Sequence, residues 1–124
     1  MTTESAGPNT DAAAVRALLA AFGEAWNAHD LNAALALTTD DVVFESTGPA
    51  PDGERFVGRA AVRGAWEPIF ADLSAYFDGE ELVVAGDRAT QCWTYHWGDG
   101  HIRGIDCFTL RDGKVAAKLS YVKG

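Results

Sequence analysis

The chain after Ala75 most constrains the fold, because nearly all of it is typical of β-strands. Four segments have this character: residues 76–85, 88–97, 101–111 and 114–122. They are separated by three dipeptides that favour tight hairpin turns: Gly86-Asp87, Asp99-Gly100 and Asp112-Gly113. We therefore expect four consecutive antiparallel strands joined by short turns.

The chain before these strands has the apolar spacing of helices. Three are expected: one to about residue 28, one over residues 31–37 and one over residues 59–73. Thr10 or Asp11 is the expected N-cap of the first helix, and Asp30 that of the second. Pro68 lies inside the third helix and predicts a kink or an early end, because proline removes a helical hydrogen bond.

A strand over residues 42–47 is expected between the second and third helices, on the basis of its β-branched residues. Residues 48–58 contain two prolines and three glycines and are expected to form a loop. Helices followed by an antiparallel meander make an α+β arrangement. We expect a curved antiparallel sheet wrapped around three N-terminal helices, with a conical cavity at one end.

Composition and charge exclude several classes of partner. The net charge is −8 and Lys and Arg form no cluster, which argues against nucleic acid and against an anionic membrane surface. No apolar run approaches the roughly 20 residues that a membrane span needs. Residues 1–9 are expected to be a flexible N-terminal tail without the layout of a secretory signal, and residues 10–124 a single domain. A cytoplasmic location is the resulting expectation.

One acidic residue stands out within the strand-like segment 100–110. Alternation places Ile102, Asp106 and Phe108 on the same face of this strand. A carboxylate on an otherwise apolar face must be paired, protonated or functional, because burying it without a partner is too costly. Asp106 is therefore the most important candidate polar group.

Strand register decides which side chains surround Asp106. A turn at Asp99-Gly100 predicts that Trp93 is opposite Asp106 and that Trp93, Tyr95 and Trp97 share its face. The register of the last hairpin has two alternatives. A three-residue loop over residues 111–113 puts Lys118 opposite Asp106, on the same face of the sheet. A two-residue turn at Asp112-Gly113 instead points Lys118 to the outer face.

Three longer stretches carry a family resemblance: AWNAHDLNAALALTTDDVVFES (residues 25–46), VGRAAVRGAW (57–66) and IDCFTLRDGKVAAKLSYV (105–122). The chain from Asp11 onward resembles the nuclear transport factor 2-like superfamily, and within it the SnoaL-like and ketosteroid isomerase-like proteins. The resemblance implies a cystatin-like α+β barrel, a homodimer formed through the sheet, and the three-residue form of the last loop. The family includes isomerases, cyclases, dehydratases, epoxide hydrolases and non-catalytic binders.

The resemblance also locates possible site positions. In ketosteroid isomerase, three side chains carry out the reaction. A tyrosine and a protonated aspartate bind the oxyanion, and a second aspartate is the base. Their places fall on Phe22, Asp106 and Ser46, so only Asp106 is matched. SnoaL-like cyclases are similar but carry a histidine and an aspartate on the last strand, and those places fall on Lys118 and Ser120.

These observations define a candidate site. The expected catalytic residues are Asp106, Lys118 and Tyr95. Lys118 is either an acid, base or amine nucleophile with a lowered pKa, or a structural partner of Asp106. The expected ligand-binding residues are Phe22, Trp26, Phe44, Ser46, Trp66, Phe70, Trp93, Trp97, Phe108 and Ser120.

Two functions agree with such a site. The first is a cofactor-free isomerase, polyketide cyclase-like enzyme, hydratase or other lyase that acts on a small hydrophobic, carbonyl-bearing molecule. The second is a non-catalytic ligand-binding or dimerisation domain. No grouping of His, Cys and Asp has metal-ligand spacing, so neither a metal nor a cofactor is expected.

Overall fold

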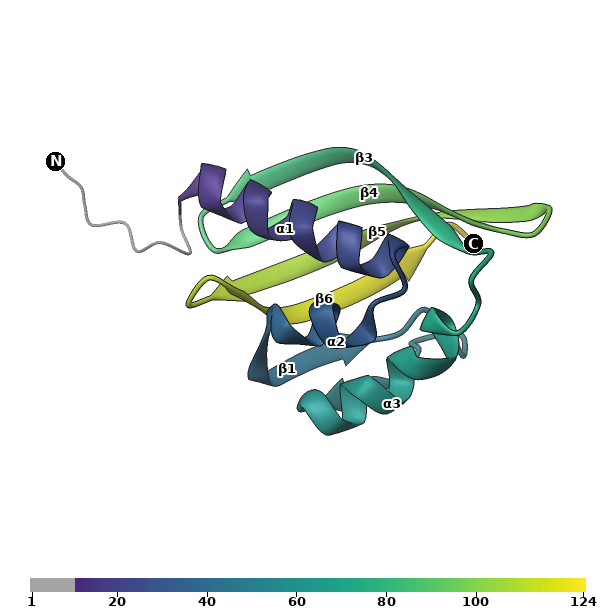
Figure 1. Ribbon diagram of the computed structural model, residues 1–124. Helices are drawn as coiled ribbons and strands as arrows, with labels where there is room; N and C mark the ends of the chain where they lie inside the picture. Colours follow the sequence, from purple (N-terminus) through teal and green to yellow (C-terminus); the bar gives the residue numbers. More distant parts are fainter. Residues whose placement is uncertain (1–10) are drawn as a thin grey trace, which may run out of the picture.

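The computed structural model describes residues 11–124. Three helices lie on one side of a six-stranded curved sheet (Figure 1): α1 (Ala12–Asn27), α2 (Leu31–Ala36) and α3 (Arg59–Phe70). The strands are β1 (Thr38–Glu45), β2 (Arg55–Val57), β3 (Tyr76–Ala85), β4 (Arg88–Trp97), β5 (Gly100–Arg111) and β6 (Lys114–Val122). Their order in the sheet is β2-β1-β6-β5-β4-β3, and all neighbours are antiparallel except β1 and β6, which are parallel.

The expected α+β class is confirmed, and α1 and α2 end within one residue of their expected ends, whereas α3 ends three residues before the expected residue 73. Asp11 caps α1 by accepting a 3.0 Å hydrogen bond from the amide of Ala13, and Asp30 caps α2 by accepting one of 3.0 Å from Ala33. Helix α3 ends at Phe70, two residues after Pro68, as the proline predicts. The expected flexible tail, residues 1–9, lies outside the described residues.

Two expectations about the middle of the chain are wrong. Strand β1 begins at Thr38 rather than Val42, because its start pairs in parallel with β6 at Val115. The expected loop over residues 48–58 contains the short strand β2, which pairs with the end of β1. Phe56 of β2 stacks on Phe44 of β1 with ring centroids 5.9 Å apart, which gives this segment an apolar contact.

The concave face of the sheet and the helices enclose an aromatic core. Helix α1 crosses this face in Figure 1 and buries Phe22 and Trp26. The Trp26 ring lies 5.0 Å from that of Trp66 and 4.5 Å from that of Phe70, both on α3.

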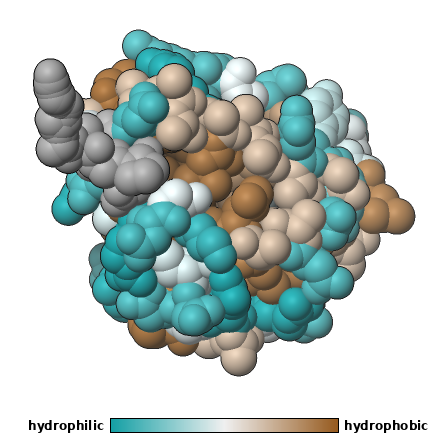
Figure 2. Space-filling view, turned by 60° about the vertical axis from the view of Figure 1, so that its left-hand side comes forward, coloured by the Kyte–Doolittle hydropathy of each residue, from teal (hydrophilic) through white to brown (hydrophobic). Residues whose placement is uncertain are grey.

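On the face shown in Figure 2, apolar side chains gather in the middle and hydrophilic side chains surround them, so apolar residues also reach the surface here.

The β4–β5 hairpin differs from its predicted register by two residues. Trp97 pairs with Gly100, so the turn is Gly98-Asp99 and not Asp99-Gly100. Gly98 has a φ of 48°, which a glycine adopts without strain. A shift of two residues leaves every side chain on its predicted face, but it puts Gln91 opposite Asp106 and Trp93 opposite Gly104.

The β5–β6 hairpin combines a tight turn with a bulge. Asp112 and Gly113 both have positive φ, 55° and 72°, and form the two-residue turn. The three-residue loop is therefore wrong, and this turn alone would point Lys118 outward. However, the register shifts between Leu110↔Val115 and Thr109↔Ala117, which leaves one extra residue in β6. The bulge restores Lys118 to the face of Asp106.

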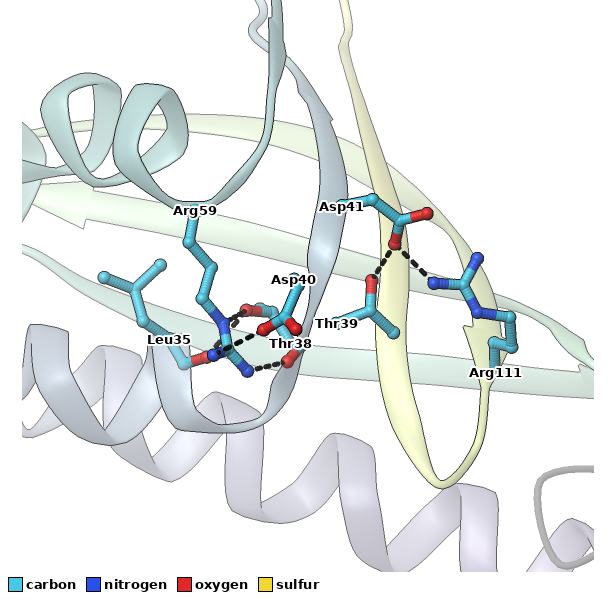
Figure 3. A network of polar contacts seen from close by, with 7 residues as sticks. All are labelled: Leu35, Thr38, Thr39, Asp40, Asp41, Arg59 and Arg111. Carbon is cyan, nitrogen blue, oxygen red and sulfur yellow. Dashed lines mark hydrogen bonds and ion pairs between the residues drawn. The ribbon is translucent and has the colours of Figure 1, made fainter.

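A polar network fixes the start of β1 (Figure 3). Arg59, the first residue of α3, donates to the carbonyl oxygen and the hydroxyl of Thr38 and lies 2.9 Å from a carboxylate oxygen of Asp40. Arg111, at the end of β5, donates to Asp41. These contacts join the beginning of α3 and the end of β5 to the first residues of β1.

Candidate functional site

Three buried polar side chains meet on the concave face: Asp106 of β5 and Lys118 and Ser120 of β6. Ser120 is directly across from Asp106, and its hydroxyl donates a 2.7 Å hydrogen bond to Asp106 Oδ1. Lys118 Nζ donates to Ser120 Oγ over 2.8 Å and to Asp106 Oδ1 over 3.4 Å. Their exposed fractions are 5% for Asp106, 5% for Lys118 and 9% for Ser120. We call these three residues the polar triad.

The environment of Lys118 is strongly apolar. Its Nζ lies 4.9 Å from the centroid of the Trp26 ring and 5.0 Å from that of Phe44. Burial disfavours the charged ammonium and lowers the pKa of Lys118, while the charge of Asp106 and its hydrogen bond oppose this shift only in part. The predicted Asp106–Lys118 pair is thus present, with Ser120 bridging it.

Two cavities flank the polar triad. The α1 cavity, of about 100 Å³, lies between α1 and the sheet and is lined by Asp106, Lys118, Phe22 and Phe108, among others. The α3 cavity, of about 320 Å³, lies by the ends of β1 and α3 and is lined by Lys118, Ser120, Tyr95 and Phe44, among others. The larger volume falls within the range of small-molecule sites. Four residues line both cavities: Trp26, Phe77, Trp93 and Lys118.

Three of the expected ligand-binding aromatics lie away from these cavities. Trp66 is fully buried in the core and Phe70 packs against it, with ring centroids 6.2 Å apart. Trp97 is 40% exposed near the tip of the β4–β5 hairpin. Neither cavity is lined by any of the three. The remaining expected residues, including Ser46, line one cavity or both.

Tyr95 does not lie beside Asp106. It lines the α3 cavity, whereas Asp106 lines the α1 cavity. The two-residue change of register explains this: Gln91 pairs with Asp106, so Tyr95 is four residues, or about 13 Å, further along β4. Burial and the charge of Asp72 raise the pKa of Tyr95, so its phenol stays protonated at neutral pH.

The hydroxyl of Ser46 serves the loop between β1 and β2. It donates to the carbonyl of Gly48 over 2.7 Å and accepts from the amide of Glu54 over 3.0 Å. Ser46 lines the α3 cavity, but its hydrogen-bonding capacity is taken up by backbone groups. The position that the family resemblance assigns to a base therefore carries a structural side chain.

Phe77 and Gln91 are two of the cavity-lining residues that were not among the expected site residues. Phe77 of β3 lines both cavities and lies 4.4 Å from the Tyr95 ring and 5.1 Å from that of Trp93. Gln91 lines the α1 cavity opposite Asp106, and its amide donates to the carbonyl of Cys92 over 2.9 Å. Strand alternation could have identified Phe77, but Gln91 required the true register.

Within residues 11–124, no cluster of three or more His, Cys, Asp or Glu side chains could hold a metal ion. In the same part of the chain, no helix is both long and apolar enough to cross a membrane. The site is thus described by its polar triad, its aromatic walls and its two cavities.

Curved sheet, covering helices and an aromatic cavity with one buried carboxylate define a small α+β domain of the cone-shaped, nuclear transport factor 2-like class. Residues 19–118 match the model of the SnoaL-like domain, and the chain belongs to this family. None of the curated proteins compared with the sequence matches it.

Solved structures support the same assignment. A nuclear transport factor 2-like protein of unknown function from Mesorhizobium loti is 37% identical, with a TM-score of 0.81 over 90% of this chain and 93% of that one. A proposed ketosteroid isomerase from Kribbella flavida DSM 17836 is 20% identical, with a TM-score of 0.77 over 93% and 82%. The epoxide hydrolase/cyclase-like enzyme SalBIII, which acts in pyran ring formation in salinomycin, is 18% identical, with a TM-score of 0.79 over 92% and 94%. The last two likenesses show the shared fold.

Proposed function

We propose that the protein binds a small hydrophobic molecule with a carbonyl group in the α3 cavity and catalyses proton transfer on it without a cofactor. The observation that carries this proposal is the buried hydrogen-bonded chain from Lys118 through Ser120 to Asp106, which opens onto aromatic cavities. A buried acid–base pair in a cavity is the arrangement expected of a catalytic site.

The triad divides the chemistry between its members. A ligand carbonyl oxygen beside Lys118 Nζ would be stabilised by this donor as negative charge develops on it. Asp106 accepts the proton that leaves the carbon next to the carbonyl, through the Ser120 hydroxyl, and returns it elsewhere on the ligand. Proton transfer of this kind can lead to isomerisation, cyclisation or loss of water. Tyr95 would orient the far end of the ligand in the α3 cavity.

The comparisons support this class of reaction. SalBIII is described as epoxide hydrolase/cyclase-like, and the Kribbella flavida protein as a proposed ketosteroid isomerase. Ketosteroid isomerisation is acid–base chemistry that uses a positioned carboxylate base. The apolar lining of the α3 cavity favours a hydrophobic substrate here.

Deuterium exchange tests the proposal. Small hydrophobic ketones are incubated with the protein in D₂O, and loss of the hydrogens next to the carbonyl is followed by proton NMR. Wild type should accelerate exchange for at least one ketone, and Asp106→Asn should lower that rate about 100-fold or more. Asp99→Asn, which changes an exposed carboxylate in the β4–β5 turn, is the matched control and should keep the rate.

A non-catalytic binder is the second candidate function. Two observations favour it: Phe22 has no hydroxyl at the place where the resemblance implies a catalytic tyrosine, and the Ser46 hydroxyl is occupied by backbone groups. A ketone that binds wild type and Asp106→Asn equally well, with no exchange in either, would support this candidate over the first.

We also propose that the protein forms a homodimer through the outer face of the sheet. Ile105, Cys107 and Leu119 on this face are only partly buried, and Tyr121 is 52% exposed. An apolar sheet face of this kind is typical of an interface. Light scattering should give twice the chain mass for wild type and the single-chain mass for Tyr121→Glu. A wild-type monomer at micromolar concentration would contradict the dimer.

A further inference from the structure

We propose that the Lys118 amine forms an imine with a small aldehyde or ketone bound in the α3 cavity. This inference rests on the proposed function and makes it more specific, because it assigns a covalent step to one side chain. The observations behind it are that Lys118 lines both cavities, that its Nζ is bonded to Ser120, and that Nζ has aromatic surroundings.

Lys118 is placed differently from the other lysines of the chain. The sequence contains three lysines, and Lys114 and Lys123 are exposed. Lys118 is 5% exposed, yet it lines both the α1 and the α3 cavity. Lys118 is therefore a buried lysine that borders a cavity of a size that could hold a small carbonyl compound.

The surroundings favour the reactive form of the amine. Only an unprotonated amine can attack a carbonyl, and burial among Trp26 and Phe44 lowers the pKa of Lys118. The bonds from Nζ to Ser120 Oγ and from Ser120 Oγ to Asp106 Oδ1 give the ammonium proton a direct path to the carboxylate. Apolar walls also limit the water that would hydrolyse an imine.

The step balances within the polar triad. The ammonium of Lys118 first gives a proton to Asp106 through Ser120. The nitrogen then attacks the carbonyl carbon, the new C–N bond replaces the C=O π bond, and the oxygen takes the proton of the Asp106 carboxyl group. The nitrogen next returns one proton to Asp106, and the hydroxyl leaves with it as water. A protonated imine remains beside the Asp106 carboxylate, with no oxidant or reductant consumed.

A purely structural ion pair is the competing interpretation. In that case the ammonium keeps its proton to neutralise Asp106, and the amine does not react. The two interpretations differ in the rate at which Lys118 undergoes reductive alkylation. A protonated lysine in a closed pair should react more slowly than the exposed lysines, whereas an imine-forming lysine should react faster.

Reductive trapping separates them. Wild-type protein is incubated with propanal, butanal, benzaldehyde or cyclohexanone and sodium cyanoborohydride, which delivers hydride to an imine and leaves a stable secondary amine. Peptide mass spectrometry then measures the rate at each lysine. We expect at least one compound to modify Lys118 tenfold or more faster than Lys114 and Lys123. Lys114→Arg and Lys123→Arg should keep this adduct, and Lys118→Arg should lose it. Ser120→Ala, which retains the amine, should slow its formation.

Site mapping on wild type keeps the result independent of how any variant folds. Modification confined to the exposed lysines, or no modification at all, would overturn the imine. Binding is followed in parallel by the indole signals of Trp26 and Trp93. If a compound shifts these signals and Lys118 stays unmodified, the imine is wrong and the proposed binding site stands. If no compound does either, the proposed function fails as well.

Discussion

Ser120 is directly across the β5–β6 ladder from Asp106, and its hydroxyl donates a 2.7 Å hydrogen bond to Asp106 Oδ1. The same hydroxyl accepts a 2.8 Å hydrogen bond from Lys118 Nζ, which is itself 3.4 Å from that carboxylate oxygen. Each hydrogen bond through Ser120 is therefore shorter than the direct contact between the two charged groups. Ser120 also connects the α3 cavity to the carboxylate that lines the α1 cavity.

Replacing Ser120 with alanine should destabilise the fold. The change leaves Lys118 without its nearer acceptor in a buried position, which costs about 1–3 kcal/mol of the free energy of unfolding. Urea denaturation measures this loss. Ser74→Ala is the matched control, because Ser74 donates an equally short bond of 2.7 Å to Asp72 in an exposed position. It should change stability by less than about 0.5 kcal/mol. Equal losses in the two variants would contradict the importance of the buried link.

The buried lysine predicts how stability depends on pH. The pKa of Lys118 is lowered below 10.5, so the unfolded chain binds more protons than the folded one between the lowered pKa and 10.5. In this window the contribution of Lys118 to the free energy of unfolding rises with pH. Subtracting the curve of Lys118→Met removes the contributions that other groups share between the two proteins.

We subtract the free energy of unfolding of Lys118→Met from that of wild type. This difference should increase from neutral pH toward pH 10.5. Asp106 and Asp72 are the charged groups that line the same cavities, and Asp106 is the one bonded to Lys118. Denaturation curves across the pH range check this. A difference that falls as pH rises would show instead that Asp106 dominates and raises the lysine pKa.

Gly104 is required by the packing of Trp93. A Cβ atom on Gly104 would lie 2.4 Å from Trp93 Cη2 and 2.4 Å from the carbonyl oxygen of Tyr121. The indole and the backbone of β6 would both have to move, so Gly104→Ala should cost about 1–3 kcal/mol. Gly64→Ala is the control, because nothing lies within 4 Å of its Cβ position in α3 and alanine favours helix. If Gly104→Ala is as stable as Gly64→Ala, Trp93 does not pack as described.

The sequence predicted the meander well, because turn dipeptides and strand-like segments are local signals. Strands β3 and β4 have the predicted bounds, and β5 begins one residue earlier than expected, at Gly100. The burial of Asp106 and Phe108 followed from simple alternation. The presence of the Asp106–Lys118 pair was also predicted, although from a three-residue loop that the structure does not have.

The detailed arrangement of the site depends on long-range contacts that local patterns do not reveal. The bulge in β6 lies where Val115 donates a 2.8 Å hydrogen bond to the carbonyl of Leu37, more than 70 residues earlier in the chain. The register of β1 on β6 shifts in the same region, between Thr38 and Val43. Because the bulge decides that Asp106 faces Ser120, the triad could not be derived from the hairpin sequence alone.

The separation of Tyr95 from Asp106 has a similar origin. Whether the turn is at Gly98-Asp99 or at Asp99-Gly100 changes the register by two residues and leaves the faces unchanged. Alternation therefore placed Tyr95 on the correct face, but not at the correct distance along the strand.

Indole signals of ¹⁵N-labelled protein test the central claim most directly. Trp26 and Trp93 line both cavities, Trp66 is buried in the core outside them, and Trp97 is 40% exposed on the hairpin. Titration with small hydrophobic ketones and aldehydes should shift the indole signals of Trp26 and Trp93 in a saturable way and leave those of Trp66 and Trp97 in place. Unchanged signals for Trp26 and Trp93 with every compound, or equal shifts of all four, would contradict ligand binding beside the polar triad.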